Sequence, residues 1–486
     1  MPARFARPLL LAACALLLPL AAAHAQTALP DAVSAALERA SVPPEAVSMV
    51  VAPLPPPSPG SAAGSAAPAA RLDWQADKPM NLASVTKLFT TYAALDMLGP
   101  GYFWKNRVSI EGQVKDGVLR GNLIIKGSGD PKLVHERLLD LVAAIRERGI
   151  QHIVGDVVLD DGIFSLPPHD AAAFDGDPLR PYNAGPSGML VNFGALVFKF
   201  QPDAGGQNAV ISTEPPVAGI DIAATVPLAR GACGDWRARL KADFSNPSQI
   251  RFKGSFPAAC GEQSWAIAYP DAAHFAQYAL EGAWRAAGGS LTGQVRTQKG
   301  VAEGAAWVTG FSLPLAQIIA DVNKLSNNVM AQQVFLTLSA ARGGRGSFQE
   351  SQNAFAHWWR GRFGARAVPV LDNGAGLSRQ AHASAASLTA LLQQAASGPN
   401  AAAFVDSLSV AGVDGTTVNM RARNPDSQAL GNAHLKTGSL RDVNAIAGYA
   451  YGRSGQTYTV VGIINHPNAS NARAALDRLV EWAVQD

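Results

Sequence analysis

The chain has 486 residues, of which 48% are hydrophobic and 16% are charged. A chain of this length can bury more than one hydrophobic core, so we expect two or three domains. The chain has 40 Lys and Arg residues and 37 Asp and Glu residues. If the first 25 residues are removed, as argued below, Arg4 and Arg7 are lost and the counts become 38 and 37. This near-neutral balance argues against nucleic acid as a partner, because binding to phosphate backbones needs an excess of positive charge.

The first 25 residues have the layout of a secretory signal peptide. Arg4 and Arg7 precede an apolar run from Leu9 to Ala23, and the small residue Ala25 follows. This pattern predicts cleavage after Ala25 and export to the periplasm. The string LAAC, which ends at Cys14, leaves a lipoprotein acylation site as the alternative. No later stretch reaches the roughly 18 consecutive apolar residues of a membrane span, so we expect no integral membrane segment.

Two cysteines remain once Cys14 is removed. Cys233 and Cys260 lie 27 residues apart, and in an exported protein we expect them to form a disulfide, two free buried thiols being the alternative. Two sulfur atoms without nearby Cys or His partners do not make a zinc site. The sequence therefore implies no metal and no organic cofactor.

Residues 26–104 are expected to form the first part of an α/β domain. The pattern predicts, in chain order, a helix over Asp31–Ala40, a strand over Ala46–Leu54, a flexible loop rich in Pro, Gly, Ser and Ala over Pro55–Ala70, and a strand over Arg71–Ala76. A further helix opens at Ser84 and is closed by Gly99-Pro100. Because this helix has apolar residues at helical spacing, it places Ser84 and Lys87 on one face.

Residues 105–298 have a different texture, which predicts a β-rich insertion of two subdomains. Short alternating runs are separated by Gly, Pro and Asp, as in Val118–Lys126, Gly155–Asp160, Leu190–Phe200 and Ala209–Thr213.

Residues 299–486 return to a mixed α/β pattern. We expect helices over Leu315–Leu325, Asn327–Ala341 and around Phe355–Trp359, then a strand with Lys436, a hairpin of Asn444–Tyr451 and Thr457–Asn465, and a final helix over Asn471–Val484. The simplest architecture is one α/β domain made from both ends of the chain, with the middle inserted into it.

Three short motifs carry the chemistry. They are Ser84-Val85-Thr86-Lys87 and Ser326-Asn327-Asn328, each at a helix start, and Lys436-Thr437-Gly438 on a strand before a hairpin. Each motif alone is weak, because S-x-x-K and S-x-N are ordinary at helix caps and K-T-G is ordinary in turns. The case rests on their order and on the element that holds each one. The motifs of zinc peptidases, P-loop nucleotide binding, C-x-x-C redox sites and G-x-S-x-G hydrolases do not occur in the sequence.

The order and context of these motifs resemble the serine penicillin-binding proteins and β-lactamases. The chain is most similar to the class C low-molecular-mass group, the D-alanyl-D-alanine carboxypeptidase/endopeptidases. The resemblance covers nearly all of the mature chain, through stretches such as NLASVTKLFTTYAALDMLGP, NKLSNNVMAQQVF, DNGAGLSR, AGVDGTT and LKTGSLRDVNAIAGYA. It implies a penicillin-binding-protein/β-lactamase-like domain with an antiparallel sheet flanked by helices, and the gap between Ser84 and Ser326 leaves room for the extra domains of this group.

The resemblance also implies a role for each motif residue. Ser84 is the nucleophile, and a neutral Lys87 accepts its proton; a second cation, Lys436, and desolvation lower the Lys87 pKa. Ser326 relays a proton toward the leaving amine, and the Asn328 amide binds the substrate backbone. Lys436 and Thr437 bind the terminal carboxylate.

The remaining implied roles concern the oxyanion and the strand edge. The backbone N–H groups of Ser84 and Ser439 form the oxyanion hole, and Gly438 leaves the edge bare so that substrate can pair along it. The motif Ser-Asn-Asn departs from the common Ser-Asp-Asn, but its central residue has no catalytic role. Leu82 stands where a proline is common, which concerns only the entry into the helix.

One acid in the insertion is a candidate for substrate recognition. Asp177 resembles the residue that holds the free amino group of a diaminopimelate-type side chain, and Asp175 is its close rival. A solvated loop aspartate in the string FDGDP is the alternative.

We therefore expect an exported serine hydrolase that acts on D-alanyl-D-alanine bonds of peptidoglycan peptides through an acyl-enzyme on Ser84. Its partners are peptidoglycan peptides and β-lactam antibiotics, which should trap the enzyme. Two alternatives are a β-lactamase with fast deacylation and a cell-wall binding protein without catalysis.

Overall fold

The computed structural model describes residues 28–54, 69–302 and 304–486. The predicted signal peptide, the Cys14 alternative and nearly all of the predicted loop Pro55–Ala70 lie outside these residues. Within the described part of the chain, no helix combines the length and the apolar character needed to cross a membrane.

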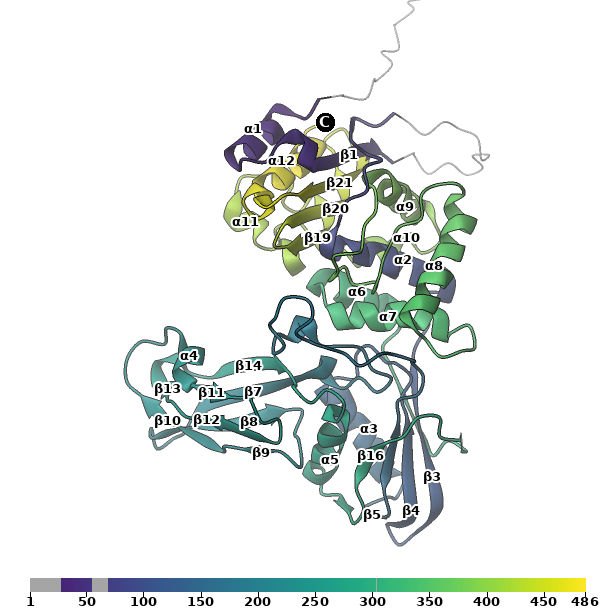
Figure 1. Cartoon of the computed structure of the whole chain (residues 1–486), viewed down its shortest axis with the longest axis vertical. Coiled ribbons are helices and arrows are strands. Elements are labelled where there is room, and N and C mark those ends of the chain that lie inside the picture. The colour runs from purple at the N-terminus through teal and green to yellow at the C-terminus, as the bar shows by residue number, and fades with distance from the viewer. Residues whose placement is uncertain (1–27, 55–68, 303) are drawn as a thin grey trace, which may run out of the picture.

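Both ends of the chain meet in one antiparallel sheet (Figure 1). Its strand order is β18 (Ser409–Val410), β19 (Ala433–Leu440), β20 (Val443–Tyr451), β21 (Thr457–Asn465), β1 (Val47–Pro53) and β2 (Leu72–Trp74). The N-terminal strand β1 pairs with the C-terminal strand β21, so that Val50 lies opposite Val461. The predicted fold class, an antiparallel sheet flanked by helices and built from both chain ends, is confirmed.

Helices cover both faces of this sheet because its central strands are apolar on both sides. In β1, Val50 and Ala52 belong to one hydrophobic core, whereas the alternate residues Met49 and Val51 belong to the other. The first core contains residues of α2 (Lys87–Leu98), α6 (Leu315–Leu325), α7 (Asn328–Ala340), α8 (Phe348–Phe363), α9 (Ala385–Ser397) and α10 (Ala401–Asp406). The second contains residues of α1 (Asp31–Arg39), α11 (Met420–Arg423) and α12 (Arg473–Val484).

The middle of the chain begins with a mixed sheet of seven strands. These are β3 (Lys105–Lys115), β4 (Val118–Lys126), β5 (His152–Val154), β6 (Val157–Asp160), β15 (Ser290–Leu291), β16 (Val295–Thr297) and β17 (Val308–Phe311). Two helices that the sequence analysis did not identify, α3 (His135–Glu147) and α5 (Phe275–Ala286), contribute to its core. Because β17 pairs with β3, this sheet continues past residue 298, and we propose that the inserted region extends to Phe311.

A second part of the insertion has its own aromatic core. It combines a five-stranded sheet of β7 (Ala195–Pro202), β8 (Asn208–Glu214), β10 (Thr225–Ala229), β13 (Phe256–Pro257) and β14 (Gln263–Ala268) with a small sheet of β9 (Asp221–Ile222), β11 (Ala242–Asp243) and β12 (Gln249–Phe252). This core is separate from that of the seven-stranded sheet, which supports the proposed division into two subdomains. In the structure a disulfide joins Cys233 and Cys260 here.

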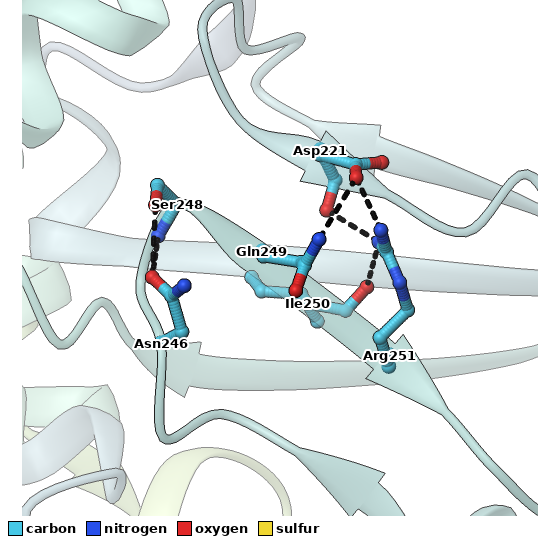
Figure 2. A network of polar contacts seen from close by, with 6 residues as sticks. All are labelled: Asp221, Asn246, Ser248, Gln249, Ile250 and Arg251. Atoms are coloured by element: carbon cyan, nitrogen blue, oxygen red, sulfur yellow. Dashed lines mark hydrogen bonds and ion pairs between the residues drawn. The ribbon is translucent and has the colours of Figure 1, made fainter.

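A surface network links β9 to β12, which pair in parallel (Figure 2). The Arg251 guanidinium donates to the carboxylate of Asp221, and its Nη1 also donates to the Asp221 carbonyl at 2.9 Å. The ion pair lowers the pKa of Asp221. Because this ion pair is largely exposed, it contributes little to stability.

Candidate active site

Ser84 lies at the entrance of α2 and not inside it. It belongs to a 3₁₀ turn, Ala83–Thr86, and α2 begins at Lys87. In a 3₁₀ turn side chains three residues apart eclipse one another, and the Lys87 Nζ atom lies 3.0 Å from Ser84 Oγ. The motif predicts Ser84 and Lys87 on one face of an α-helix, and the tighter 3₁₀ turn brings the two side chains together in the same way.

Lys87 is fully buried and is surrounded by neutral oxygen acceptors. Besides Ser84 Oγ, its Nζ donates to Asn328 Oδ1 at 2.7 Å and to the Ala375 carbonyl at 2.6 Å. Among the described residues no carboxylate pairs with it. Burial, and then the charge of Lys436, place the pKa of Lys87 well below that of an ordinary lysine. Such a lysine can be a neutral base near physiological pH.

Lys436 supplies the second amine of the site. It lies on β19, is fully buried, and donates to Ser326 Oγ at 2.8 Å and to the Thr437 carbonyl at 2.7 Å. Burial lowers its pKa to about 7. Ser326 itself ends α6 with a left-handed backbone, φ 58°, which turns its side chain toward the strand. The hydroxyls of Ser84 and Ser326 therefore each have a lysine partner.

The two asparagines of the middle motif make different contacts. The Asn327 side chain caps α7 by accepting a hydrogen bond from the Met330 N–H at 3.1 Å, while Asn328 contacts Lys87. Because aspartate and asparagine are comparable caps, the departure from Ser-Asp-Asn leaves the geometry of the cleft intact.

β19 presents an open edge beside Ser84. The short strand β18 pairs only with His434 and Leu435, so within the described chain Lys436–Leu440 have a strand partner, β20, on one side alone. A Cβ atom at Gly438 would lie 2.4 Å from the Leu82 carbonyl and 2.9 Å from the Ser84 nitrogen. The strand thus packs directly against the turn that carries Ser84.

Thr437 and Ser439 extend from the same strand. Thr437 Oγ1 donates to Thr416 Oγ1 at 2.7 Å, at the solvent-exposed edge. The Ser439 hydroxyl donates to Asn444 Oδ1 at 2.8 Å, so its side chain is occupied. Any contribution of Ser439 to an oxyanion hole would therefore come from its backbone N–H.

The segment from Asp175 to Asn183 reaches the cluster through its backbone. Asn328 Nδ2 donates to the Tyr182 carbonyl at 3.0 Å. Asp175 organises this segment, because it accepts hydrogen bonds from Tyr182 OH at 2.9 Å and Asn183 Nδ2 at 2.7 Å. The Asp177 side chain is exposed and lies 3.5 Å from Arg180. It makes no bond to Ser84, Lys87, Ser326 or Lys436 in the described part of the chain.

Sequence reasoning missed three groups that complete the site. They are the carbonyls of Ala375 and Tyr182 and the hydroxyl of Thr416. Ala375 lies between two glycines in the stretch DNGAGLSR, and these glycines were the sequence signal for a close backbone approach. Gly376 has φ 75°, and a Cβ atom there would lie 1.9 Å from the Ala83 carbonyl. Backbone carbonyls carry no side-chain signature, which is why they were missed.

The family model and the curated relatives that match this chain describe the same kind of protein. A family model described as the D-Ala-D-Ala carboxypeptidase 3 (S13) family matches residues 62–485. D-alanyl-D-alanine carboxypeptidase DacB of Haemophilus influenzae is 24% identical over 81% of this chain and 82% of its own length. A D-alanyl-D-alanine carboxypeptidase of Actinomadura sp. is 27% identical over 82% of this chain and 77% of its own.

The fold has solved counterparts. The crystal structure of penicillin binding protein 4 (dacB) from Haemophilus influenzae superposes with a TM-score of 0.72 and 22% identity, covering 92% of this chain and 99% of that one. Its complex with a β-lactam superposes with a TM-score of 0.68 and 20% identity, covering 92% and 97%. At this identity the likeness concerns the fold.

Proposed function

Because the chain belongs to the D-Ala-D-Ala carboxypeptidase 3 (S13) family and is therefore a serine peptidase hydrolase, we propose that it cleaves the terminal D-alanyl-D-alanine bond, and D-alanyl cross-links, of peptidoglycan stem peptides. The reaction runs through an acyl-enzyme on Ser84. β-Lactams acylate the same oxygen and inhibit the enzyme.

The observation that carries this proposal is the contact of Ser84 Oγ with a fully buried lysine, Lys87, at 3.0 Å. A serine hydroxyl is a weak nucleophile until a base removes its proton. Burial and the positive charge of Lys436 favour the neutral amine of Lys87, and a neutral amine can take the proton. Ser84 Oγ then forms a bond to the D-alanyl carbonyl carbon.

Collapse of the tetrahedral intermediate breaks the C–N bond and needs a proton on the leaving nitrogen. Ser326 gives this proton and recovers one from Lys436; the hydrogen bond from Lys436 Nζ to Ser326 Oγ at 2.8 Å supports this role. Water then attacks the acyl carbon and releases the shortened peptide, and one proton of the water restores the Ser84 hydroxyl. The proton that Lys87 took from Ser84 replaces the one that Lys436 gave up, so both lysines return to their starting states. The developing oxyanion is held by the backbone N–H groups of Ser84 and Ser439; loss of one such donor typically costs about 10²- to 10³-fold in rate.

The part of the substrate that leaves as the terminal residue binds at the open end of β19. Lys436 and Thr437 bind the carboxylate of the terminal residue, or that of a β-lactam, by charge-assisted hydrogen bonds. The substrate adds to the free edge of β19, which is open because β18 pairs only with His434 and Leu435. Gly438 does not open this edge, contrary to the expectation from the resemblance, because the space beside its Cα is filled by the turn that carries Ser84.

This function places the mature enzyme outside the cytoplasm, where its substrate lies. We propose a periplasmic location after removal of residues 1–25. The disulfide between Cys233 and Cys260 in the structure suits an oxidising compartment.

Labelled penicillin tests the function. We expect one covalent adduct, which peptide mass mapping assigns to Ser84, and Ser84→Ala should abolish it. Label that survives this substitution would defeat the assignment. An adduct that persists for minutes supports the carboxypeptidase, whereas rapid turnover supports the β-lactamase alternative. A folded protein that takes up no label would point to a cell-wall binding protein.

We also propose that Asp177 holds a free amino group on the substrate side chain. Its exposure leaves it accessible, and Arg180 is its only charged contact in the described chain. Hydrolysis rates of matched peptides with a free and an acetylated side-chain amine test this role. Asp177→Ala should remove the preference for the free amine, and an unchanged preference excludes Asp177.

A further inference from the structure

The two most exposed large hydrophobic side chains of the described chain lie next to residues of the proposed site. Leu325 is 65% exposed and directly precedes Ser326, and Val413 is 55% exposed on the loop that leads to Thr416. A single exposed apolar residue is ordinary on a protein surface. Two such residues on segments that meet beside a reactive site instead suggest a contact surface for a ligand.

The two segments that carry these side chains are fixed to each other. Lys324 Nζ donates to the Asp414 carboxylate at 2.6 Å, and a Cβ atom at Gly415 would lie 2.7 Å from the Lys324 carbonyl. Lys324 directly precedes Leu325, and Asp414 directly follows Val413. The end of α6 and the loop 411–417 therefore keep the two apolar side chains on neighbouring stretches of surface.

This surface lies on the side of the site where the proposed leaving group binds. Ser326 accepts a hydrogen bond from Lys436 at 2.8 Å, and in the proposed reaction it protonates the leaving nitrogen. Thr416, in the same loop as the exposed valine, accepts a hydrogen bond from Thr437 at 2.7 Å. The two apolar side chains thus stand one and three residues away from hydroxyls that face the leaving group.

The surface also carries one positive charge. The charge of Lys324 is matched by Asp414, as described above. Arg421 is exposed, and its Nε donates to the Gly412 carbonyl at 3.1 Å; within the described chain no carboxylate pairs with its guanidinium. The combination of apolar side chains with a guanidinium suits a ligand that has methylene groups and a carboxylate.

The two bonds that the proposed function attacks differ in what leaves. Cleavage of the terminal bond releases a single D-alanine, whose carboxylate binds at Thr437 and which extends no further. Cleavage of a cross-link releases a whole peptide, joined through the side-chain amine of a diamino acid. That side chain is a run of methylene groups, and stem peptides carry carboxylates. A surface beyond Thr437 therefore meets the substrate only when the bond is a cross-link.

We propose that Leu325, Val413 and Arg421 bind the leaving peptide of a cross-link. The two apolar side chains pack against the methylene groups of its diamino acid, and the guanidinium pairs with one of its carboxylates. This inference rests on the proposed function and deepens it, because it makes these three residues determinants of the preference for cross-links over the terminal bond.

A pair of substrates tests the proposal. We would measure kcat/KM for a D-alanyl cross-link between two stem peptides and for the terminal D-alanyl-D-alanine bond of one stem pentapeptide. In the double variant Leu325→Asn, Val413→Thr the ratio of the first value to the second should fall about five- to tenfold, the effect of losing part of the apolar area of two side chains from a contact. Val210→Thr changes a valine on β8 that is 47% exposed; it is the matched control and should leave the ratio unchanged.

A second variant separates the charge from local structure. Arg421→Gln should lower the same ratio about threefold, as expected for one exposed ion pair, when the leaving peptide has free carboxylates. It should leave the ratio unchanged when those carboxylates are amidated. A loss with both peptides would mean that Arg421 acts only by holding the Gly412 carbonyl, and would overturn its role in binding.

The remaining outcomes distinguish this inference from the proposed function. An unchanged ratio in the double variant, or equal losses on both substrates, would overturn the inference. Penicillin labelling of Ser84 in each variant shows that a selective loss does not come from a misfolded site. A failure of the proposed function would appear already in the wild type, which would then cleave neither bond. A wild type that cleaves only the terminal bond would overturn the inference and leave the carboxypeptidase standing.

Discussion

Gly438 of β19 and Ser84 are in direct backbone contact: a Cβ atom on Gly438 would lie 2.9 Å from the Ser84 nitrogen and 2.4 Å from the Leu82 carbonyl. The third motif therefore holds the turn that carries Ser84, the proposed nucleophile. The contact also brings the two proposed oxyanion donors to adjacent positions, one on each side of Gly438.

Gly438→Ala should separate the strand from the turn. Because both neighbours are backbone atoms, the clash cannot be relieved by a rotamer change, and the oxyanion donors move apart. We expect the rate of penicillin acylation to fall about 10²-fold or more, as when an oxyanion donor is lost. Gly361→Ala on α8, where a Cβ meets open space, is the control and should acylate normally. Normal acylation by Gly438→Ala would contradict this account of the contact.

The two buried lysines predict a specific pH dependence of acylation. The positive charge of Lys436 lowers the pKa of Lys87, so removing it should raise that pKa. In Lys436→Met the limb of the pH–rate profile that rises as Lys87 loses its proton should move to higher pH. The second-order rate of penicillin acylation between pH 5 and 10 measures it. Lys253→Met, a change on the exposed face of the insertion, should leave the limb in place; an unmoved limb in Lys436→Met would mean that Lys87 is not the base.

Lys436 should also make stability depend on pH. In the folded protein its pKa is about 7, against 10.5 for the ordinary side chain, so between these values the unfolded chain binds more protons. The free energy of unfolding then rises with pH from about 7 to 10.5, and the destabilising effect of the buried charge is complete below pH 7. Lys436→Met should unfold at higher urea concentration than the wild type at pH 7, and its advantage should shrink toward pH 10. If the difference in urea midpoint between Lys436→Met and the wild type instead grew with pH, folding would not lower the pKa of Lys436.

Asp175 and Asp177 predict opposite phenotypes. Asp175 holds Tyr182 and Asn183, and the Tyr182 carbonyl in turn accepts from Asn328. Asp175→Ala should therefore lower kcat/KM about tenfold for substrates with and without a free amine, since losing a hydrogen bond to a charged group costs about 1.5–3 kcal/mol. Asp177→Ala should affect only substrates with the amine. Both variants are measured on the same pair of peptides. If Asp175→Ala lowered kcat/KM only for the peptide with the free amine, Asp175 and not Asp177 would be the residue that binds the amine.

The strongest sequence predictions were local. Hydrophobic periodicity identified β1, β20, β21 and the helices α2, α6, α7 and α12 within a few residues, because alternation and helical spacing directly reflect which faces are buried. The three motifs could also be found in the sequence, because the residues of each motif are nearly contiguous. The weakest region was the insertion, where α3 and α5 were overlooked among short strands and glycine-rich turns.

The order of amino acids specifies which side chains are available to the site: two serines, two lysines and an asparagine in three short segments. It could not determine that both lysines are stripped of solvent, because burial depends on helices and loops far away along the chain. Packing of distant segments brings Lys87 into contact with Asn328 and Ala375, and it places Asp175 where it supports the segment over Asn328. Desolvation and long-range hydrogen bonds arise when distant segments pack, and no local pattern encodes them.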